Sequence, residues 1–345
     1  MQLHETSAHM PAPCHSTEDV TAATAAAREL LREDRLRLRG ASLLSVADLS
    51  QNQIESLLTV ADGILAAHRA RLNLFTWTYP RSLAMIFEKP SLRTRVSFDL
   101  GMRQLGGHAI ALGPQDIGLG VRESIPDVAR NLERMTDAIM ARVFEHAKLE
   151  QLRINCSIPV INGLSDREHP CQALADLLTI RQKKGRLAGL RLAWIGDGNN
   201  VLHSLLLACA AVGIAVTAAC PPGYEPLPEI VQQATTSGRP ESPIRIVTDP
   251  MEAAAGADIV YTDVWTSMGH EEEQLARIRA FRSYQVNAAL MARAKPDALF
   301  MHCLPAHRGD EVTDEVVDGP QSVVFHQAEN RLHAQKALLA LLLGP

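Results

Sequence analysis

The sequence predicts an α/β protein with two doubly wound domains, each built on a parallel sheet, and a C-terminal helix that packs back on the first domain. Short apolar runs alternate with segments of helical period almost throughout the chain, which is typical of parallel-sheet α/β layering. A polar stretch from Lys183 to Gly189 interrupts the alternation and divides it into two series. A chain of 345 residues is long enough for two hydrophobic cores.

The elements of the first domain, which we place at residues 37–180, follow in order. A helix begins at Ser50, because Ser50 and Gln53 form a capping box ahead of apolar positions that repeat at helical spacing. The apolar run 83–87 predicts a strand, and the helix after Arg93 ends near the glycine pair 106–107. The remaining elements are strand 108–112, a helix from Ser124 to about Met135, strand 138–141, a short helix, strand 158–161 and helix 170–184.

The second domain, at residues 185–320, has its predicted strands at 190–195, 214–219, 244–247, 257–262 and 298–302. The segment 321–345 contains a helical run rich in Ala and Leu from about residue 328 to 343. Residues 1–36 form an N-terminal extension whose acidic residues and Ala/Thr-rich composition match neither a signal peptide nor a mitochondrial presequence. We expect this extension to be flexible or weakly helical.

Composition narrows the class of protein. The chain is 46% hydrophobic and 21% charged, as in soluble globular proteins, and no apolar run approaches the ~20 residues of a membrane helix. A net charge of −5 gives no electrostatic reason to expect nucleic acid or a membrane surface as a partner. The six cysteines are scattered without a C-x-x-C pair, which favours a reducing compartment over a disulfide framework. We therefore expect a cytoplasmic protein.

The segment Ser91 to Arg95, between a predicted strand and a predicted helix, has the features of an anion site. A helix start offers free backbone N–H groups and the positive end of the helix dipole. The hydroxyls of Ser91 and Thr94 and the guanidinium of Arg93 add donors that suit a phosphate. Taken alone, the segment is equally consistent with a Ser N-cap followed by two surface arginines. We expect Arg95 to pair with Glu88 across the loop.

Other chemically active side chains follow the remaining predicted strands. Ligands of open parallel sheets bind outside the carboxyl ends of the strands. Each residue also has an ordinary structural explanation, such as an ion pair for Arg142, a helix cap for His169 or a core position for Cys303. The shared location favours one site formed by Arg142, His169, Gln172, Asn199, Asn200, Asp263, Ser267, Met268, His302, Cys303, Leu304 and Arg331.

Two alternative sites fit the sequence poorly. The segment Gly196 to Val201 follows a strand and starts a helix, as in dinucleotide-binding folds. Its third small residue is replaced by Val201, however, and no acid follows at the end of the next strand, 217–221. His302 and His307 lack a matched pair of ligands at helical spacing, so we expect no metal.

Four motifs, in order along the chain, resemble the aspartate/ornithine transcarbamylase family. They are Ser91-x-Arg93-Thr94-Arg95 (carbamoyl-phosphate loop), His169-Pro170-x-Gln172 (carbamoyl-holding motif), Asp263-x-x-x-Ser267-Met268-Gly269 (ornithine loop) and His302-Cys303-Leu304-Pro305 (cysteine-bearing loop). The similarity extends from about residue 38 to 343. Position 92 is Leu where many members carry Thr. Leu serves as well if the backbone N–H binds the ligand, and changes the affinity if the hydroxyl does.

The resemblance implies an enzyme that transfers the carbamoyl group of carbamoyl phosphate to the δ-amine of L-ornithine, without metal or cofactor. It implies catalytic roles for Arg142, Cys303 and Asp263, with Cys303 positioning groups or handling a proton rather than attacking as a nucleophile. The implied carbamoyl-phosphate site is Ser91, Leu92, Arg93, Thr94, Arg142, His169, Gln172, Cys303, Leu304 and Arg331. The implied ornithine site is Asn200, Asp263, Ser267 and Met268. A homotrimer or a multiple of trimers is also implied, with the loop 114–120 near a neighbour's site.

Three alternatives stay open at this point. An aspartate-using relative would need cations for a second carboxylate, whereas the second-domain loops supply an acid, a Ser-Met-Gly turn and a cysteine. A putrescine-using relative would need no partner for a carboxylate. An inactive binding homologue is the alternative outside the enzyme class, and the presence of all the expected arginines argues against it.

Overall fold

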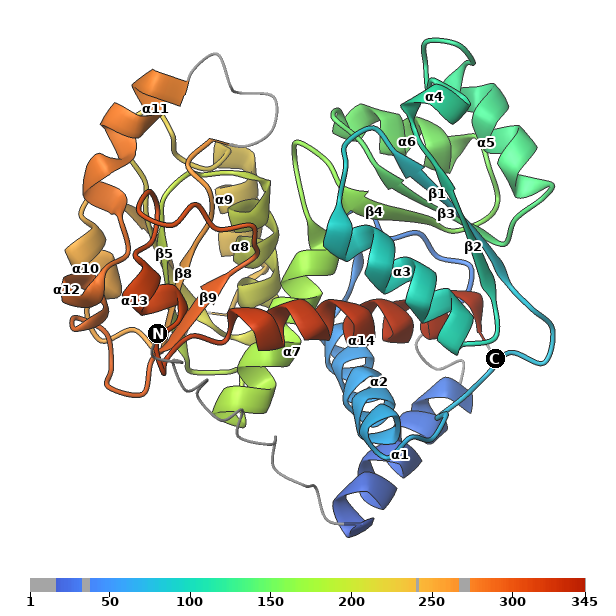
Figure 1. Cartoon of the computed structure of the whole chain (residues 1–345), viewed down its shortest axis with the longest axis horizontal. Helices are drawn as coiled ribbons and strands as arrows, with labels where there is room; N and C mark the ends of the chain where they lie inside the picture. Colours follow the sequence, from blue (N-terminus) through green and yellow to red (C-terminus); the bar gives the residue numbers. More distant parts are fainter. Residues whose placement is uncertain (1–16, 33–37, 240–241, 267–273, 345) are drawn as a thin grey trace, which may run out of the picture.

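The computed structural model describes residues 17–32, 38–239, 242–266 and 274–344, and it contains two parallel sheets (Figure 1). The first sheet has the order β2-β1-β3-β4 and the second the order β7-β6-β5-β8-β9. The strands are β1 (Ser82–Phe87), β2 (His108–Leu112), β3 (Ala138–Arg142), β4 (Val160–Leu164), β5 (Arg191–Ile195), β6 (Ala215–Ala219), β7 (Ile244–Val247), β8 (Ile259–Thr262) and β9 (Leu299–His302). The predicted fold class is confirmed.

The helices connect and cover these strands. They are α1 (Thr17–Arg32), α2 (Gln51–Arg69), α3 (Leu92–Gln104), α4 (Pro114–Ile117), α5 (Ile125–Glu133), α6 (His146–Ile154), α7 (Pro170–Lys184), α8 (Asn200–Val212), α9 (Pro228–Ser237), α10 (Pro250–Ala254), α11 (Gln274–Phe281), α12 (Ala288–Met291), α13 (Asp314–Val317) and α14 (Val324–Leu343), with 3-10 turns η2 (Val46–Asp48) and η4 (Arg282–Tyr284). None of the described helices is long and apolar enough to cross a membrane.

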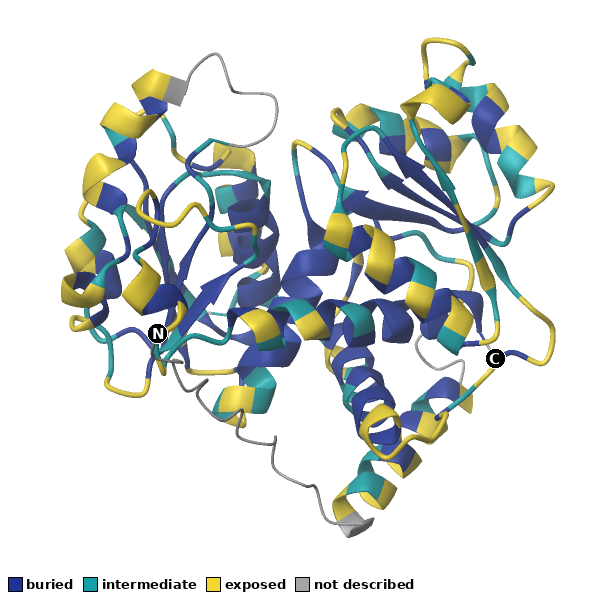
Figure 2. Ribbon diagram, in the orientation of Figure 1, coloured by how far each residue is buried: buried dark blue, intermediate teal, exposed yellow. Residues whose placement is uncertain are grey.

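The central strands of both sheets are buried on both faces, which explains why they are apolar without alternation. In β1, Leu83 and Met85 belong to one hydrophobic core and Ala84 and Ile86 to another. The central strand of the second sheet, β5, divides its side chains between two cores in the same way. Figure 2 shows both sheets as buried layers between helices whose outer faces are exposed. Because the faces of the central strands are covered, polar side chains gather at the carboxyl ends of the strands.

The strand register brings the ends that carry the predicted site residues side by side. Arg142, the last residue of β3, pairs with Phe87 at the end of β1, directly before the Ser91 loop. In the second sheet Thr262 lies between Ile195 and His302, so that Asp263 and Cys303 follow neighbouring strands.

Helices α7 and α14 join the two domains (Figure 1). Helix α7 leaves the first sheet after β4 and ends at Gly185, which has a φ of 71° and leads into the second series of strands. Helix α14 begins beside β9 and returns to the first domain, where Lys336 packs on Gly101 of α3. The predicted C-terminal helix is therefore present and begins at Val324, four residues earlier than the apolar pattern suggested.

Part of the N-terminal extension is helical, which is one of the two expected forms. Thr17–Arg32 form the regular helix α1, which packs on α2, whereas residues 1–16 and 33–36 lie outside the described residues. Ala27 is fully buried, and a Cβ atom placed on Gly63 of α2 would lie 2.3 Å from the Cβ of Ala27. The small side chains that look uninformative in the sequence are thus the ones that allow the two helices to approach closely.

Candidate active site

The start of α3 forms the first part of the site. Ser91 is the N-cap, and its Oγ accepts a hydrogen bond from the N–H of Thr94 at 3.3 Å. The side chain of Leu92 is 74% exposed, so its backbone N–H is the group that faces the helix terminus. Arg93 donates from Nη2 to the carbonyl oxygen of Leu304, which links the first domain to the second.

The expected pair between Arg95 and Glu88 is wrong. Glu88 instead binds Lys148 of α6, with 2.7 Å between Oε1 and Nζ, and accepts from the N–H of Phe144 at 2.8 Å. Arg95 is exposed on the outside of α3. The anchor that holds this loop therefore comes from α6, an element with no visible relation to the loop in the sequence.

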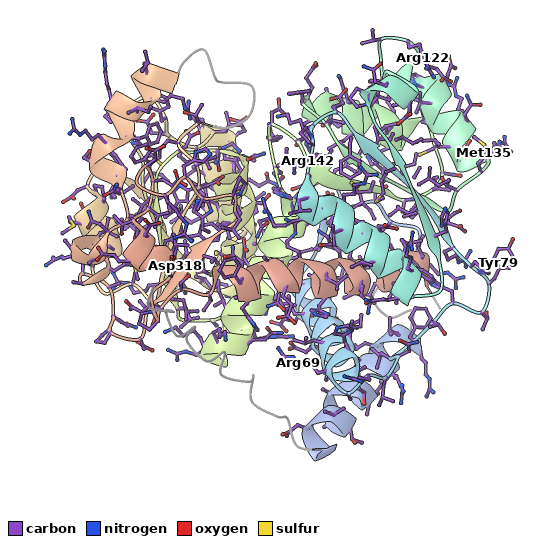
Figure 3. The ribbon with its side chains drawn as sticks, viewed as in Figure 1. Arg69, Tyr79, Arg122, Met135, Arg142 and Asp318 are labelled. Carbon is purple, nitrogen blue, oxygen red and sulfur yellow. The ribbon has the colours of Figure 1, made fainter. Side chains whose placement is uncertain are left out.

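Three arginines from different elements converge at the domain boundary. Arg142 ends β3, Arg93 lies in α3 and Arg331 lies in α14, and none forms an ion pair with a carboxylate of the described residues. Figure 3 shows Arg142 on the side of the first domain that faces the second. Burial and the guanidiniums of Arg331 and Arg93 lower the pKa of Arg142 to about 10. Such a concentration of uncompensated positive charge suits an anion.

His169 and Gln172 enter from the start of α7. His169 is buried, and burial together with the guanidiniums of Arg331, Arg142 and Arg93 holds its pKa well below the ordinary value. The imidazole is therefore neutral at physiological pH, and its Nδ1 has no hydrogen-bond partner among the described residues. A buried ring nitrogen without a partner is unusual and is consistent with a group that meets a ligand.

Arg331 is almost completely buried and is held from both sides. Its Nη1 donates to Oε1 of Gln172 at 2.6 Å and its Nη2 donates to Oγ1 of Thr94 at 3.1 Å. The side-chain amide of Gln335, with its oxygen turned toward the guanidinium, accepts from Nη2 at 2.8 Å and Nε at 3.1 Å. Arg331 is thereby fixed against both α3 and α7.

The second domain contributes a hydrogen-bonded group at the ends of β8 and β9. Cys303 donates from Sγ to Oδ1 of Asp263 at 2.9 Å, and Asn199 donates from Nδ2 to Oδ2 at 2.8 Å. The N–H of Val264 also donates to Oδ1 at 2.8 Å. Burial and the neighbouring Asp263 carboxylate raise the pKa of Cys303 well above the ordinary value. Cys303 is consequently a thiol rather than a thiolate nucleophile.

Of the other residues predicted to bind ornithine, the structure describes only Asn200. Asn200 donates from Nδ2 to the carbonyl oxygen of Ser165 at 2.5 Å, which ties the start of α8 to the first domain and leaves one amide hydrogen for a ligand. The predicted Ser267 and Met268 lie outside the described residues.

Sequence reasoning missed Glu311, which supports the cysteine-bearing loop. Its Oε1 lies 3.2 Å from Nε2 of His302 and accepts from the N–H of His307 at 2.5 Å. The N–H of Leu304 donates to Nδ1 of His302 at 2.9 Å, which leaves the hydrogen of this neutral ring on Nε2, facing Glu311. Leu304 itself has a φ of 59°, a conformation that non-glycine residues adopt only under tertiary constraint. Glu311 lies in a polar segment whose sequence is typical of a surface turn, so nothing in the sequence indicates its supporting role.

One group of side chains has the composition of a metal site. The potential ligand atoms of Asp263, His302 and Cys303 lie within 4.8 Å of one another. Both ring nitrogens of His302 face hydrogen-bond partners, and the Asp263 carboxylate accepts from three donors. The geometry is that of a hydrogen-bonded cluster.

The fold and the site define a two-domain α/β protein whose first domain presents an anion site and whose second domain presents a carboxylate beside a thiol. Residues 41–182 match the model of the aspartate/ornithine carbamoyltransferase carbamoyl-phosphate-binding domain, and residues 188–342 match that of the Asp/Orn-binding domain. The chain belongs to the aspartate/ornithine carbamoyltransferase family.

Individual relatives agree with this assignment. The chain is 52% identical over 302 residues to an ornithine carbamoyltransferase of Methanoculleus marisnigri, covering 87% of this chain and 96% of the relative. It is 52% identical over 307 residues to that of Bacillus subtilis, covering 89% and 95%. The structure of ornithine carbamoyltransferase from Pyrococcus furiosus is similar with a TM-score of 0.86 and 49% identity, covering 89% of this chain and 98% of that one. The resemblance predicted from the four motifs is confirmed.

Proposed function

We propose that this chain is an ornithine carbamoyltransferase, which converts carbamoyl phosphate and L-ornithine into L-citrulline and phosphate. The observation that carries the proposal is that two groups of side chains with different chemistry lie at the domain boundary, one suited to carbamoyl phosphate (the carbamoyl half-site) and one suited to ornithine. The three arginines that converge at the domain boundary suit an anion, and the Asp263–Cys303 pair of the second domain suits an amino group. The match of the two halves of the chain to a carbamoyl-phosphate-binding domain and an Asp/Orn-binding domain supports the same substrates.

Carbamoyl phosphate binds first in this proposal. The phosphate is held by the side chains of Ser91, Arg93, Thr94 and Arg142 and by the backbone N–H of Leu92. Arg142, His169 and Gln172 surround the carbamoyl group, with Arg331 and the backbone at Cys303 and Leu304 on its other side. As a tetrahedral centre forms, the carbonyl oxygen gains negative charge, and donors already in place stabilise that state more than the ground state.

Ornithine enters from the second domain. The Asp263 carboxylate accepts three hydrogen bonds in the protein and retains capacity for a fourth, which we assign to the α-ammonium. The α-carboxylate is assigned to Asn200 and the 267–268 loop. A free alkylamine has a pKa of about 10.4. The nearby guanidiniums and partial burial favour the neutral δ-amine that must attack.

The chemical step is a displacement through the tetrahedral centre. The neutral δ-nitrogen forms the C–N bond, the bond between the carbonyl carbon and the phosphate oxygen breaks, and the departing phosphate accepts the amine proton. The protonated Cys303 thiol orients Asp263 and the amine and forms no covalent bond to the substrate.

A panel of amines tests this proposal. Purified protein is incubated with carbamoyl phosphate and ornithine, aspartate or putrescine, and carbamoylated products are measured. Citrulline is the expected product. Preferential reaction of aspartate or putrescine would contradict the assignment of Asp263, and the absence of any product would favour a binding homologue.

We also propose a homotrimer, or a multiple of trimers, acting in arginine metabolism in the cytoplasm. Val96 and Leu100 lie one turn apart on α3 and are 45% and 40% exposed, and Ile110 on the neighbouring edge strand β2 is 46% exposed. An apolar surface next to an unpaired strand edge favours contact with a second copy. Leu100→Glu should lower the mass measured by light scattering, whereas the same substitution at the exposed Leu275 of α11 should not.

A further inference from the structure

Asp176 occupies the centre of a buried hydrogen-bond network that none of the motifs includes. It lies on α7, four residues after Gln172, and is completely buried. Its Oδ1 accepts from Nε2 of Gln172 at 2.8 Å and from Nε2 of Gln327 at 2.7 Å. Its Oδ2 accepts from the hydroxyl of Tyr261 at 3.1 Å. The carboxylate therefore joins α7, the strand β8 and α14 at the domain boundary.

One branch of the network leads to the carbamoyl half-site. The amide of Gln172 uses its nitrogen toward Asp176 and its oxygen, Oε1, to accept from Arg331 at 2.6 Å. An ionised carboxylate can only accept, so it requires the nitrogen end of the amide to face it. The same choice turns the oxygen toward the guanidinium. If the amide turned over, two acceptors would meet at Asp176 and two donors at Arg331.

The second branch leads to the cysteine-bearing loop. Gln327 donates from Nε2 to Asp176 and, at 2.8 Å, to the oxygen of Tyr261. Its Oε1 accepts from the N–H of His302 at 3.0 Å, one residue before Cys303. This amide too has a single orientation that satisfies its partners. Burial raises the pKa of Asp176 to about 7, while hydrogen bonds from Gln172, Gln327 and Tyr261 act in the opposite direction.

We propose that Asp176 is a positioning residue for carbamoyl transfer. Its carboxyl oxygens fix the orientation of the Gln172 amide toward Arg331 and, through Gln327, hold the loop that contains Cys303. The inference rests on the proposed function. It adds a residue that acts through others: Asp176 binds the predicted substrate-binding Gln172 directly and reaches the Cys303 loop through Gln327.

The variant Asp176→Asn tests the positioning role. An amide of the same shape has one acceptor oxygen. If this oxygen takes the place of Oδ1, both glutamine bonds are kept but the donor nitrogen replaces the acceptor of the Tyr261 hydroxyl; if the amide is reversed, the nitrogen faces both glutamines. Either arrangement removes the negative charge and at least one acceptor from the network. Loss of a hydrogen bond to a charged group predicts a fall in affinity of about 10- to 100-fold. The affinity is measured with a phosphonate analogue of carbamoyl phosphate that retains the amide, and kcat with ornithine is measured in parallel.

The matched control is Thr179→Val. Thr179 is equally buried on α7 and accepts from Asn330 of α14 at 2.9 Å, but among the described residues it makes no hydrogen bond with Gln172, Gln327 or Arg331. We expect this variant to bind the analogue as the wild type does. An equal loss in Thr179→Val and Asp176→Asn would show that any disturbance of the α7–α14 contact is enough, and would overturn the specific role of Asp176.

A double-mutant cycle with Gln172→Ala separates positioning from general stability. If Asp176 acts through Gln172, adding Asp176→Asn to Gln172→Ala leaves analogue binding unchanged. Two independent, additive losses would overturn the inference. Should Asp176→Asn fail to fold by circular dichroism, Gln327→Leu tests the other branch: kcat should fall, and an unchanged kcat would count against the inference.

These outcomes differ from a failure of the proposed function. A wild-type protein that forms no citrulline contradicts the proposed function itself. A wild-type protein that forms citrulline, together with an Asp176→Asn variant that retains full analogue affinity and kcat, contradicts only the role of Asp176.

Discussion

The buried guanidinium of Arg142 predicts a conflict between stability and function that a single substitution can measure. Its pKa falls from the ordinary arginine value to about 10, first because the group is buried and then because Arg331 and Arg93 lie nearby. A group whose cationic form is disfavoured by folding lowers the stability of the folded protein at every pH below its folded pKa. This cost disappears only above the ordinary pKa of a free arginine, so it is fully present near neutrality.

The magnitude follows from the two pKa values. At 1.36 kcal/mol per pH unit, the difference between the ordinary arginine pKa and about 10 corresponds to about 3 kcal/mol, which is an upper limit for what neutralisation can recover. The Nε of Arg142 makes no hydrogen bond with the described residues, so Arg142→Met keeps an apolar stem without breaking a bond at Nε. We expect the free energy of unfolding without ligand to rise by about 1–3 kcal/mol, or the Tm by a few degrees.

The same substitution should abolish most activity. Removing a charge-stabilising donor typically costs about 10²- to 10³-fold in kcat. Unfolding in urea is measured with and without carbamoyl phosphate, and citrulline formation is assayed in parallel. The wild type should gain more stability from the ligand than Arg142→Met does. A variant that is less stable than the wild type without ligand, or one that turns over normally, would refute the reasoning.

Three further outcomes are expected. Arg93→Ala removes a phosphate donor and the link to the Leu304 carbonyl, so the KM for carbamoyl phosphate should rise about 10-fold or more, and an unchanged saturation curve would count against the phosphate loop. The raised pKa keeps Cys303 protonated, so its alkylation by iodoacetamide at pH 8 should be much slower than that of a free thiol and should become faster only at higher pH. Mass spectrometry follows the alkylation, and rapid labelling at pH 8 would contradict the thiol state. Gly63→Val places a side chain where the Cβ of Ala27 already lies and should lower stability by about 1–3 kcal/mol, whereas Ala26→Val on the exposed face of α1 should not, and equal effects would argue against close packing of α1 on α2.

The elements and the outline of the site could be predicted because they depend on local patterns. The apolar strands and the polar residues that follow them fix which side chains reach the carboxyl ends of the sheets, as with Arg142 and Asp263. The capping box at Ser50 is present with both of its hydrogen bonds. In these cases a few adjacent residues contain all of the information.

The contacts that could not be predicted join residues that are far apart in the sequence. Glu88 binds Lys148, which the sequence places 60 residues away, so the nearer Arg95 was the wrong expectation. Two of the partners of Asp176, Tyr261 and Gln327, lie on β8 and α14, and only the docking of the two domains brings them to α7. Glu311 is hidden for the same reason, because its role follows from the folded path of the 303–307 loop.

The close approach of α1 and α2 has a consequence for how such sequences vary. The family match begins at residue 41, after α1, whereas Gly63 lies inside the matched domain. The requirement for Gly at position 63 is imposed by a helix that lies outside the region shared with the family. In a chain without that helix, position 63 is free to take a side chain; in a chain with it, positions 27 and 63 must change as a pair. The N-terminal helix α1 therefore restricts which residue can occupy position 63 of the shared domain, more than thirty positions further along the chain.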